Sequence, residues 1–310
     1  MMLWFWLGLI AASALMGIVL SRFGWPFELA ASLLPQIGFV ALLFSGCAFM
    51  LGRADVGLCA LAAVALCGYG ARELFEPPAP PIERRDVRVV WANVLNERQA
   101  FTRAMDLARA EGADIVMIAE LPRMREPERS ALSHGYPYHA GRGAMRGVNV
   151  ALFSRTPLQA VEPFEAPEQH YRQSLAARVQ TPAGPLQLLA VHPPVPTRPF
   201  KQRARDGTIA AAFARLRAAD APALLAGDFN TTSWSMRFRQ GLASGGVERA
   251  GLGASSTWMA PLPILGLPID HVFTANGAQA SARVGPGIGS DHLPLIIDLQ
   301  IAADTAAPAH

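Results

Sequence analysis

The residues with the clearest catalytic potential in this 310-residue chain are Asp228 and Asn230, which follow a short apolar run. The run 223–226 (A-L-L-A) is typical of a buried strand, and Gly227 is expected to end it. Because residues two apart on an extended chain point to the same side, a carboxylate and an amide would project together beyond the strand. Such a pair can activate water and hold an oxygen-rich ligand. A capped turn between strand and helix would explain the same residues equally well, so the assignment depends on their companions.

Polar residues recur wherever another apolar run stops. Carboxylates, amides and imidazoles occupy these positions, namely Asn93, Glu120, His192, Asp270 with His271, and Ser290 with Asp291 and His292. Ligand sites in α/β sheets collect outside the carboxyl ends of strands. A donor set without cysteine suits a hard cation such as Mg²⁺. The chemistry that uses this set is metal-assisted attack of water on phosphorus, with a general base and imidazole donors to the developing oxyanion.

Each of these residues also has a purely structural interpretation. Asn93 could cap a turn, Glu120 could be a solvated strand end, and His192 could be a packed loop histidine before two prolines. We expect His271 to be structural and Ser290 to order its turn. The catalytic interpretation is favoured because all the positions recur at strand ends.

The elements that must position these residues form an alternating pattern. Strands are expected near 86–93, 114–119, 147–153, 158–163, 174–180, 186–191, 223–226, 269–274, 279–284 and 293–300, and helices near 98–111, 125–133 and 199–219. Helical crossovers combined with antiparallel hairpins predict an α/β fold, a four-layer α/β/β/α sandwich of two packed sheets with helices outside.

The first 71 residues differ sharply from the rest. Three apolar runs, near 3–20, 29–52 and 56–71, are separated by only four charged residues. A bilayer core about 30 Å thick needs about 20 apolar residues, so the pattern predicts three transmembrane helices before the sandwich. The expected organisation is therefore an anchor over 1–71, a proline-rich linker over 72–85, a catalytic domain over 86–302 and a tail over 303–310.

Charge and cysteine content add further limits. The net charge of +3 is too small to argue for nucleic acid. All three cysteines lie in the apolar region, so the remainder has neither a disulfide nor a thiolate metal site. The expected location is a membrane, with the lipid bilayer as a partner. The distribution of arginines leans toward a cytoplasmic catalytic domain without settling the side.

Seven segments, in order, resemble the endonuclease/exonuclease/phosphatase superfamily over about 86–300. They are W-A-N-V-L-N (91–96), I-A-E (118–120), G-V-N-V-A-L-F-S-R-T-P-L (147–158), A-V-H-P-P (190–194), G-D-F-N (227–230), I-D-H-V-F (269–273) and G-S-D-H-L-P (289–294). One departure is Ala119, where many relatives have Gln before the metal-binding Glu. The membrane anchor plus domain also resembles a bacterial subgroup linked to glycopeptide resistance and envelope lipids, whose domain is thought to face outward. This resemblance implies a multi-pass location in a bacterial inner (cytoplasmic) membrane.

The resemblance implies a role for each matching residue. The divalent metal, Mg²⁺ with Mn²⁺ as the alternative, would be bound by Glu120 with help from Asn93, and Asp291 would support the metal side. The catalytic set would be His192 as a donor to phosphoryl oxygen, Asp228 as the residue that orients or deprotonates water, Asn230 as a positioning group, and His292 paired with Asp270. Whether Asp228 or the His292–Asp270 pair is the general base stays open.

Two segments bear on the substrate. Residues 259–269 form an apolar, proline-broken loop just before Asp270, and such patches are seldom exposed without reason. Arg198 and Lys201 follow His192 and could grip a phosphate, although a solvated helix face would look the same. We therefore expect a phosphoesterase that acts on a phosphorylated lipid. The alternatives are a membrane-tethered nuclease, which is not favoured because no basic aromatic groove is evident, and a catalytically silent scaffold.

Overall fold

The computed structural model describes residues 2–142, 145, 147–165, 174–262 and 265–302. The chain divides into two compact units. The helical unit comprises residues 1–76 with 195–203 and 231–243, and the sheet unit comprises 77–194, 204–230 and 244–310. The predicted tail over 303–310 lies outside the described residues. Two internal segments of the chain thus group with the N-terminal helices, a division that contiguous sequence boundaries do not express.

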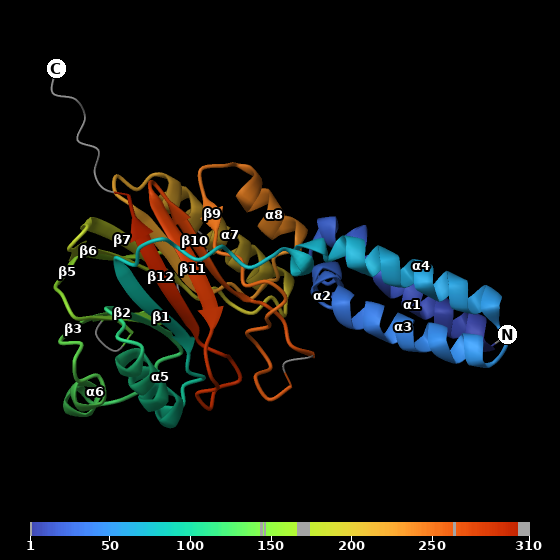
Figure 1. Cartoon of the computed structure of the whole chain (residues 1–310), viewed down its shortest axis with the longest axis horizontal. Helices are drawn as coiled ribbons and strands as arrows, with labels where there is room; N and C mark the ends of the chain where they lie inside the picture. Colours follow the sequence, from blue (N-terminus) through green and yellow to red (C-terminus); the bar gives the residue numbers. More distant parts are fainter. Residues whose placement is uncertain (1, 143–144, 146, 166–173, 263–264, 303–310) are drawn as a thin grey trace, which may run out of the picture. The chain divides into compact units, whose positions relative to one another are not determined.

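Two six-stranded mixed sheets make up the sheet unit in the described part of the chain (Figure 1). The first has the order β11-β12-β1-β2-β4-β3, with bounds Ala278–Val284, Leu295–Ile301, Val87–Asn93, Ile115–Ala119, Val150–Ser154 and Tyr138–Gly141. The second has the order β5-β6-β7-β8-β10-β9, with bounds Leu158–Phe164, Ser174–Thr181, Gly184–Val191, Ala223–Asp228, Asp270–Ala275 and Glu248–Arg249.

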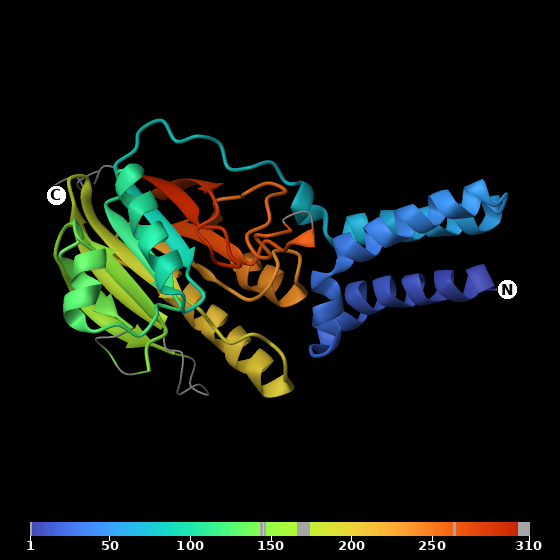
Figure 2. The same ribbon diagram turned by 90° about the horizontal axis from the view of Figure 1, so that it is seen from below.

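The two sheets pack face to face because their strands are apolar on both sides. Valine, leucine, isoleucine and alanine side chains from β1, β2, β4, β6, β7, β8, β10 and β12 form one buried cluster between the sheets. Helix α5 (Arg98–Ala110) covers the other face of the first sheet, where Phe101 and Met105 are buried (Figure 2). Phe213 of α7 (Pro199–Arg217) packs on Phe273 of the second sheet. The predicted α/β sandwich of two packed sheets flanked by helices is confirmed.

Two parallel strand pairs bring the catalytic ends together. β1 runs parallel to β2 in the first sheet, and β7 runs parallel to β8 in the second. β10 is antiparallel to β8, with Asp270 directly opposite Asp228. Side chains on facing cross-strand positions lie within contact distance. The start of β10 therefore meets the end of β8.

Gly227 has a different role from the predicted one. It does not end its strand, since β8 continues to Asp228. A Cβ at Gly227 would lie 2.3 Å from both the carbonyl oxygen and a side-chain carbon of Val191, its partner on β7. The missing side chain allows β7 and β8 to approach just before the catalytic residues, which is a packing requirement rather than a turn signal.

Some elements were not predicted from the sequence. They are the strands β3 and β9 and two helices of the helical unit, α2 (Phe27–Ser32) and α8 (Met236–Ala243). Helix α6 spans Glu126–Leu132, close to the expected position. The unpredicted elements are all short, with at most eight residues, so they carry little periodic signal.

The structure of the N-terminal helices bears on the three predicted membrane spans. Helices α1 (Met2–Ile18), α3 (Leu34–Met50) and α4 (Ala54–Gly70) have 17 residues each, or about 26 Å at the usual helical rise. Among the described residues, none of the helices combines the length and the apolar character that a bilayer crossing requires. The predictions of three transmembrane helices and of a multi-pass location in a bacterial inner membrane are therefore wrong.

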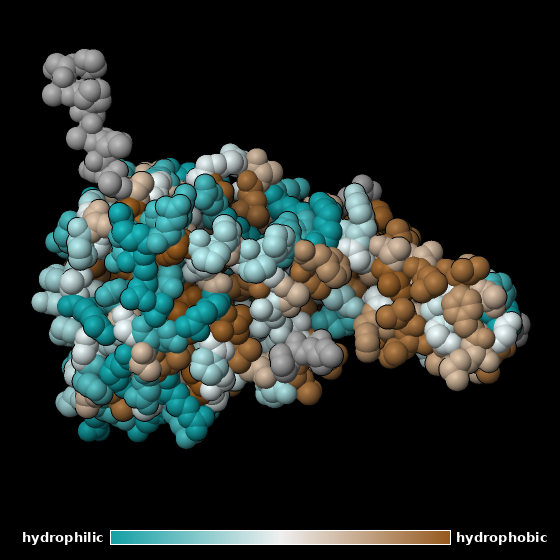
Figure 3. Space-filling model, viewed as in Figure 1, coloured by the Kyte–Doolittle hydropathy of each residue, from teal (hydrophilic) through white to brown (hydrophobic). Residues whose placement is uncertain are grey.

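The second apolar run, near 29–52, shows why the length of an apolar stretch was a misleading guide to a transmembrane helix. It breaks between α2 and α3, because Pro35 begins a new helix at its first turn. At its start, Glu28 is buried and accepts hydrogen bonds from Ser235 and Gln202 of the same unit. The run is thus two helices of a folded unit held by a buried carboxylate. Many large apolar side chains of this unit, including Trp4, Phe39 and Leu58, remain exposed (Figure 3).

Candidate active site

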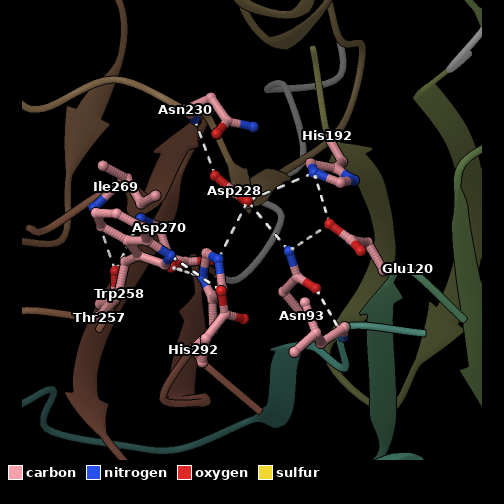
Figure 4. A network of polar contacts seen from close by, with 12 residues as sticks. Asn93, Glu120, His192, Asp228, Asn230, Thr257, Trp258, Ile269, Asp270 and His292 are labelled. Carbon is pink, nitrogen blue, oxygen red and sulfur yellow. Dashed lines mark hydrogen bonds and ion pairs between the residues drawn. The ribbon is translucent and has the colours of Figure 1, made fainter. Parts of the chain in front are cut away.

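Six of the predicted site residues converge at one end of the sheet unit (Figure 4). They come from the ends of both sheets and form one network of polar contacts, comprising Asn93, Glu120, His192, Asp228, Asp270 and His292. All except Glu120 are buried. The expectation that polar residues at separate strand ends share one site thus agrees with the geometry, while their individual roles stay predictions.

Asp270 and His292 form a buried ion pair. His292 Nδ1 lies 2.8 Å from Asp270 Oδ2, and Trp91 Nε1 donates to Asp270 Oδ1 at 2.7 Å. Burial acts to lower the pKa of His292, but the negative charges of Asp270 and Asp228 outweigh it and raise the pKa to about 10. Burial acts to raise the pKa of Asp270, yet attraction to His292 and several hydrogen bonds leave it below the ordinary value. His292 is therefore an imidazolium at neutral pH.

Asp228 differs from Asp270 in that its pKa is raised rather than lowered. The residue is 1% exposed, and burial raises its pKa to about 7, although the positive charge of His292 acts in the other direction. Asn230 N donates to Asp228 Oδ1 at 2.9 Å, while His292 Nε2 lies 3.6 Å from Oδ2. A carboxyl group with a pKa near neutrality can take up and release a proton at working pH.

Asn93 connects the two carboxylates. Its Nδ2 donates to Glu120 Oε1 at 3.3 Å and to Asp228 Oδ2 at 3.2 Å, and its Oδ1 accepts from Leu95 N at 3.1 Å. His192 Nε2 lies 3.5 Å from both Glu120 Oε1 and Asp228 Oδ2. In this arrangement the amide of Asn93 is a donor to carboxylates, with the orientation assigned from its hydrogen bonds.

Backbone strain marks two of these positions. Glu120 has φ 52° and Asn230 has φ 50°, a left-handed region in which residues other than glycine are uncommon. Such conformations cost on the order of 1–3 kcal/mol and cluster at functional sites. Glu120 comes directly after β2, so the chain turns at the residue that carries the carboxylate.

Other predicted residues lie beside the network. Asn230 Nδ2 donates to Pro193 O at 3.0 Å, which ties the end of β8 to the segment after His192. Asp291 accepts from Trp258 Nε1 at 3.1 Å, and Ser290 Oγ accepts from His292 N at 3.2 Å. The metal role of Asp291 and the positioning role of Asn230 therefore stay predictions. The ring of His271 is buried and packs edge-on against Phe229, as a structural residue does.

The two predicted substrate-binding cations belong to the helical unit. Arg198 is exposed and Lys201 is partly buried, and both belong to segment 195–203 of the helical unit. Their role in gripping a phosphate remains a prediction from the sequence.

Several contributing residues were missed by sequence reasoning. Trp91 lies two residues before Asn93 on β1, and its side chain donates a hydrogen bond to Asp270. Thr257 also contacts Asp270, because its Oγ1 accepts from the backbone N–H of Asp270 at 3.1 Å. Trp91 belongs to the motif W-A-N-V-L-N, which offered a signal. Thr257 is set in a loop, and no pattern in the sequence singles it out.

The donor set fits a divalent cation. Oxygen ligands from carboxylates and amides are preferred by hard cations. One ligand atom each from Asp228, Asp270 and His292 lies within 4.8 Å of the others. Since His292 is protonated by its pairing with Asp270, its imidazole is a poor ligand, and Glu120 and Asp228 remain as the oxygen donors outside that pair. A cation there would relieve the cost of a buried Asp228 carboxylate.

Two packed mixed sheets carry carboxylates, amides and two imidazoles at their shared end, a set of groups suited to metal-assisted hydrolysis of phosphate esters. A family model described as "Endonuclease/Exonuclease/phosphatase family" matches residues 90–292. The chain belongs to this family and is an enzyme of this class, whose members use divalent metals. The resemblance noted in the sequence is confirmed at the level of the superfamily, but not for the membrane-anchored subgroup.

Solved structures support the same fold. An endonuclease/exonuclease/phosphatase from Beutenbergia cavernae is 20% identical, with a TM-score of 0.59 over 70% of this chain and 72% of that chain. Sphingomyelinase C from Streptomyces griseocarneus is 16% identical, with a TM-score of 0.53 over 68% and 98%. A 3′ phosphatase from Neisseria, bound to product DNA hairpin, is 17% identical, with a TM-score of 0.56 over 69% and 99%. No curated protein matches the sequence.

Mg²⁺ is expected to stabilise the protein more strongly at pH 8 than at pH 6. Asp228 must be ionised to bind a cation, and its pKa in the fold is about 7. A ligand at about 100 times its Kd stabilises by about 2.7 kcal/mol, which corresponds to a rise in Tm of roughly 5–10 °C. Thermal melts with Mg²⁺ and with a chelator at both pH values measure this. Glu120→Gln is the control and should lose most of the shift; equal shifts at both pH values would contradict the role of Asp228.

Proposed function

We propose that the enzyme hydrolyses the phosphate ester of a lipid, with Asp228 as general base and His292 as a cationic donor. Mg²⁺, held by Glu120 and Asp228 with help from Asn93, would neutralise phosphate charge when bound. His192 would donate Nε2–H to a phosphoryl oxygen, and Asn230 would help to hold the loop beside Asp228. The oxygen of water would bond to phosphorus as the ester P–O bond breaks, with the proton of water going to Asp228 and the leaving ester oxygen taking a proton from solvent, so that the products are an alcohol and a phosphate.

The different charge states of the two candidate bases support this assignment. With a pKa of about 10, His292 holds its proton at neutral pH and cannot accept another. Asp228 has a pKa of about 7 in the metal-free fold, and a bound cation would lower it, so the carboxylate would be ionised and able to accept a proton at neutral pH. The pairing with Asp270 then serves to keep His292 charged, so that it can stabilise negative charge on the phosphoryl group.

The observation that carries the lipid substrate is an apolar loop attached to the catalytic pair. The two ends of the loop meet where Trp258 N donates to Leu267 O at 3.0 Å. The loop is also joined to the residue before His292, because Ala260 N donates to Asp291 O at 2.9 Å. Between these ends, Leu262 is 53% exposed and Leu265 is 42% exposed. Residues 263–264 of the predicted rim loop lie outside the described residues. An exposed apolar segment beside a phosphoesterase site suits a substrate with a hydrocarbon chain.

The lipid preference can be tested by comparing two monoesters. We expect a polyprenyl phosphate or a phosphatidate in detergent micelles to be hydrolysed with a higher kcat/KM than p-nitrophenyl phosphate, which lacks a long chain. In Leu262→Ser/Leu265→Ser, the ratio of the two kcat/KM values should fall about tenfold, from the loss of roughly 1–2 kcal/mol of apolar contact. Phosphate release is measured with Mg²⁺ and with a chelator.

Tyr138→Ser is the matched control, because Tyr138 is a similarly exposed apolar side chain on β3. Its ratio should stay at the wild-type value. An unchanged ratio in the leucine variant would refute the role of the loop. Activity confined to diesters or to 3′-phosphorylated DNA would instead favour a nuclease or DNA 3′-phosphatase.

A further inference from the structure

A second polar network extends from the site through Arg142, a residue with no role so far. Arg142 follows β3, and its guanidinium donates from two different nitrogens. Nη2 donates to Asn96 Oδ1 at 2.6 Å, and Nη1 donates to Asn149 Oδ1 at 2.8 Å. These two amides lead to different members of the catalytic set, so one side chain connects two site residues.

The first branch reaches Glu120. Asn96 Nδ2 donates to Glu120 Oε2 at 2.8 Å, and Asn96 N donates to Glu120 O at 2.9 Å. Because Asn96 Oδ1 is occupied by Arg142, the amide nitrogen must face the carboxylate. The contact uses Oε2, while Asn93 uses Oε1. Arg142 thereby fixes the orientation of the group that is expected to hold the metal.

The second branch reaches His192. Asn149 Nδ2 lies 2.6 Å from His192 Nδ1, and both side chains are buried. Arginine has donors only, so Asn149 Oδ1 must accept from it and the amide nitrogen must donate to the imidazole. Nδ1 then carries no proton, and the hydrogen lies on Nε2, the atom that faces Glu120 and Asp228. This is the tautomer that can donate to a phosphoryl oxygen.

We propose that Arg142 is a positioning residue that sets both the carboxylate of Glu120 and the tautomer of His192 through Asn96 and Asn149. The inference rests on the proposed roles of Glu120 and His192. Arginine suits this task because its planar guanidinium holds two donors in a fixed geometry, whereas lysine offers one point charge. The backbone is fixed as well, since Arg142 N donates to Val150 O at 2.7 Å across the β3–β4 pair.

Arg142→Ala and Arg142→Lys test the proposal in the full chain. Both are expected to lower kcat and to weaken Mg²⁺ binding by about 10- to 100-fold, the usual effect of removing a group that orients a ligand. Mg²⁺ affinity is measured directly by calorimetry. Arg155→Ala is the matched control, an exposed arginine at the far end of β4, and should behave as wild type. Wild-type kcat and Mg²⁺ affinity in Arg142→Lys would overturn the proposal.

The two branches can be separated. In a double-mutant cycle, Asn96→Ala should remove most of the effect of Arg142→Ala on Mg²⁺ affinity, and Asn149→Ala most of its effect on kcat. Independent, additive effects would count against the relay. If Arg142→Ala only lowers Tm and leaves kcat and Mg²⁺ affinity intact, its role is structural and the proposal fails.

A readout independent of turnover distinguishes this inference from the proposed function. Nitrogen-15 NMR of the imidazoles should report the Nε2–H form for His192 in the wild type and a mixture of tautomers in Arg142→Ala and Asn149→Ala. An Nδ1–H form in the wild type would overturn the inference even in an active enzyme. A wild type with the expected tautomer but no hydrolysis of any phosphate ester would instead refute the proposed function.

Discussion

Asp228→Asn is expected to lower kcat/KM by at least about 10³-fold and, at the same time, to raise the Tm of the metal-free protein. The loss of activity follows because an amide can neither accept the proton of water nor neutralise a cation. The gain in stability follows because the wild-type carboxylate is buried and its pKa is raised to about 7. A shift of about three pKa units corresponds to a cost of about 4 kcal/mol for the ionised form in the fold.

The size of the gain in stability from Asp228→Asn depends on pH. The folded pKa of Asp228 lies above its ordinary value, so its contribution to stability is fully present below pH 3.8 and is lost as pH rises through about 7. The variant should therefore gain most at pH 8, by on the order of 2 kcal/mol after the loss of contacts with Asn93 and His292 is subtracted, and little at pH 4. Thermal melts in chelator at the two pH values, with phosphate release in Mg²⁺, measure both effects.

Asn230→Ala is the control, because it changes a neighbouring amide without removing the buried charge. It should lower activity without raising Tm at pH 8. A fully active Asp228→Asn would remove Asp228 from the mechanism. An inactive variant that is less stable at pH 8 than at pH 4 relative to wild type would show that the carboxylate is stabilised in the fold.

The sequence located the principal residues because the fold delivers them at strand ends. Asn93, Glu120 and Asp228 each follow an apolar run, and parallel pairing brings the ends of such runs together. The same logic pointed to the sandwich of two sheets, since the runs alternate with helical segments. These features depend on local periodicity, which a single sequence displays directly.

The features that the sequence did not reveal depend on contacts between distant segments. Asn96 and Asn149 lie in two of the matching motifs, but only the β3–β4 pair and the turn after β1 bring them together with Arg142, which no motif contains. The N-terminal region was misjudged for a related reason. Apolar length alone suggested membrane spans, whereas Pro35 divides one run and Glu28 is buried among polar partners.

Asp270→Asn is expected to cause the largest loss of stability, about 3–5 kcal/mol in the metal-free protein at pH 6. Asp270 is fully buried and accepts from both His292 and Trp91, so its removal leaves an imidazolium without its partner. The folded pKa of His292 is raised from 6.5 to about 10. The stability that this pair contributes is therefore fully present below pH 6.5 and is lost as pH rises through about 10.

The loss caused by Asp270→Asn should consequently shrink as pH rises, and urea unfolding followed by circular dichroism at pH 6 and pH 10 measures the change. His292→Gln removes the charge from the other side, and in that background Asp270→Asn should cost far less, with a coupling free energy of a few kcal/mol at pH 6. Equal losses at pH 6 and pH 10, or additive losses in the double variant, would mean that the two residues do not form a charged pair. If the pair is charged, His292 enters the reaction as a cation, and the proton of the attacking water must go elsewhere. Asp228, whose Oδ2 lies 3.6 Å from His292 Nε2 and which is not paired with the imidazole ring as Asp270 is, is then the acceptor.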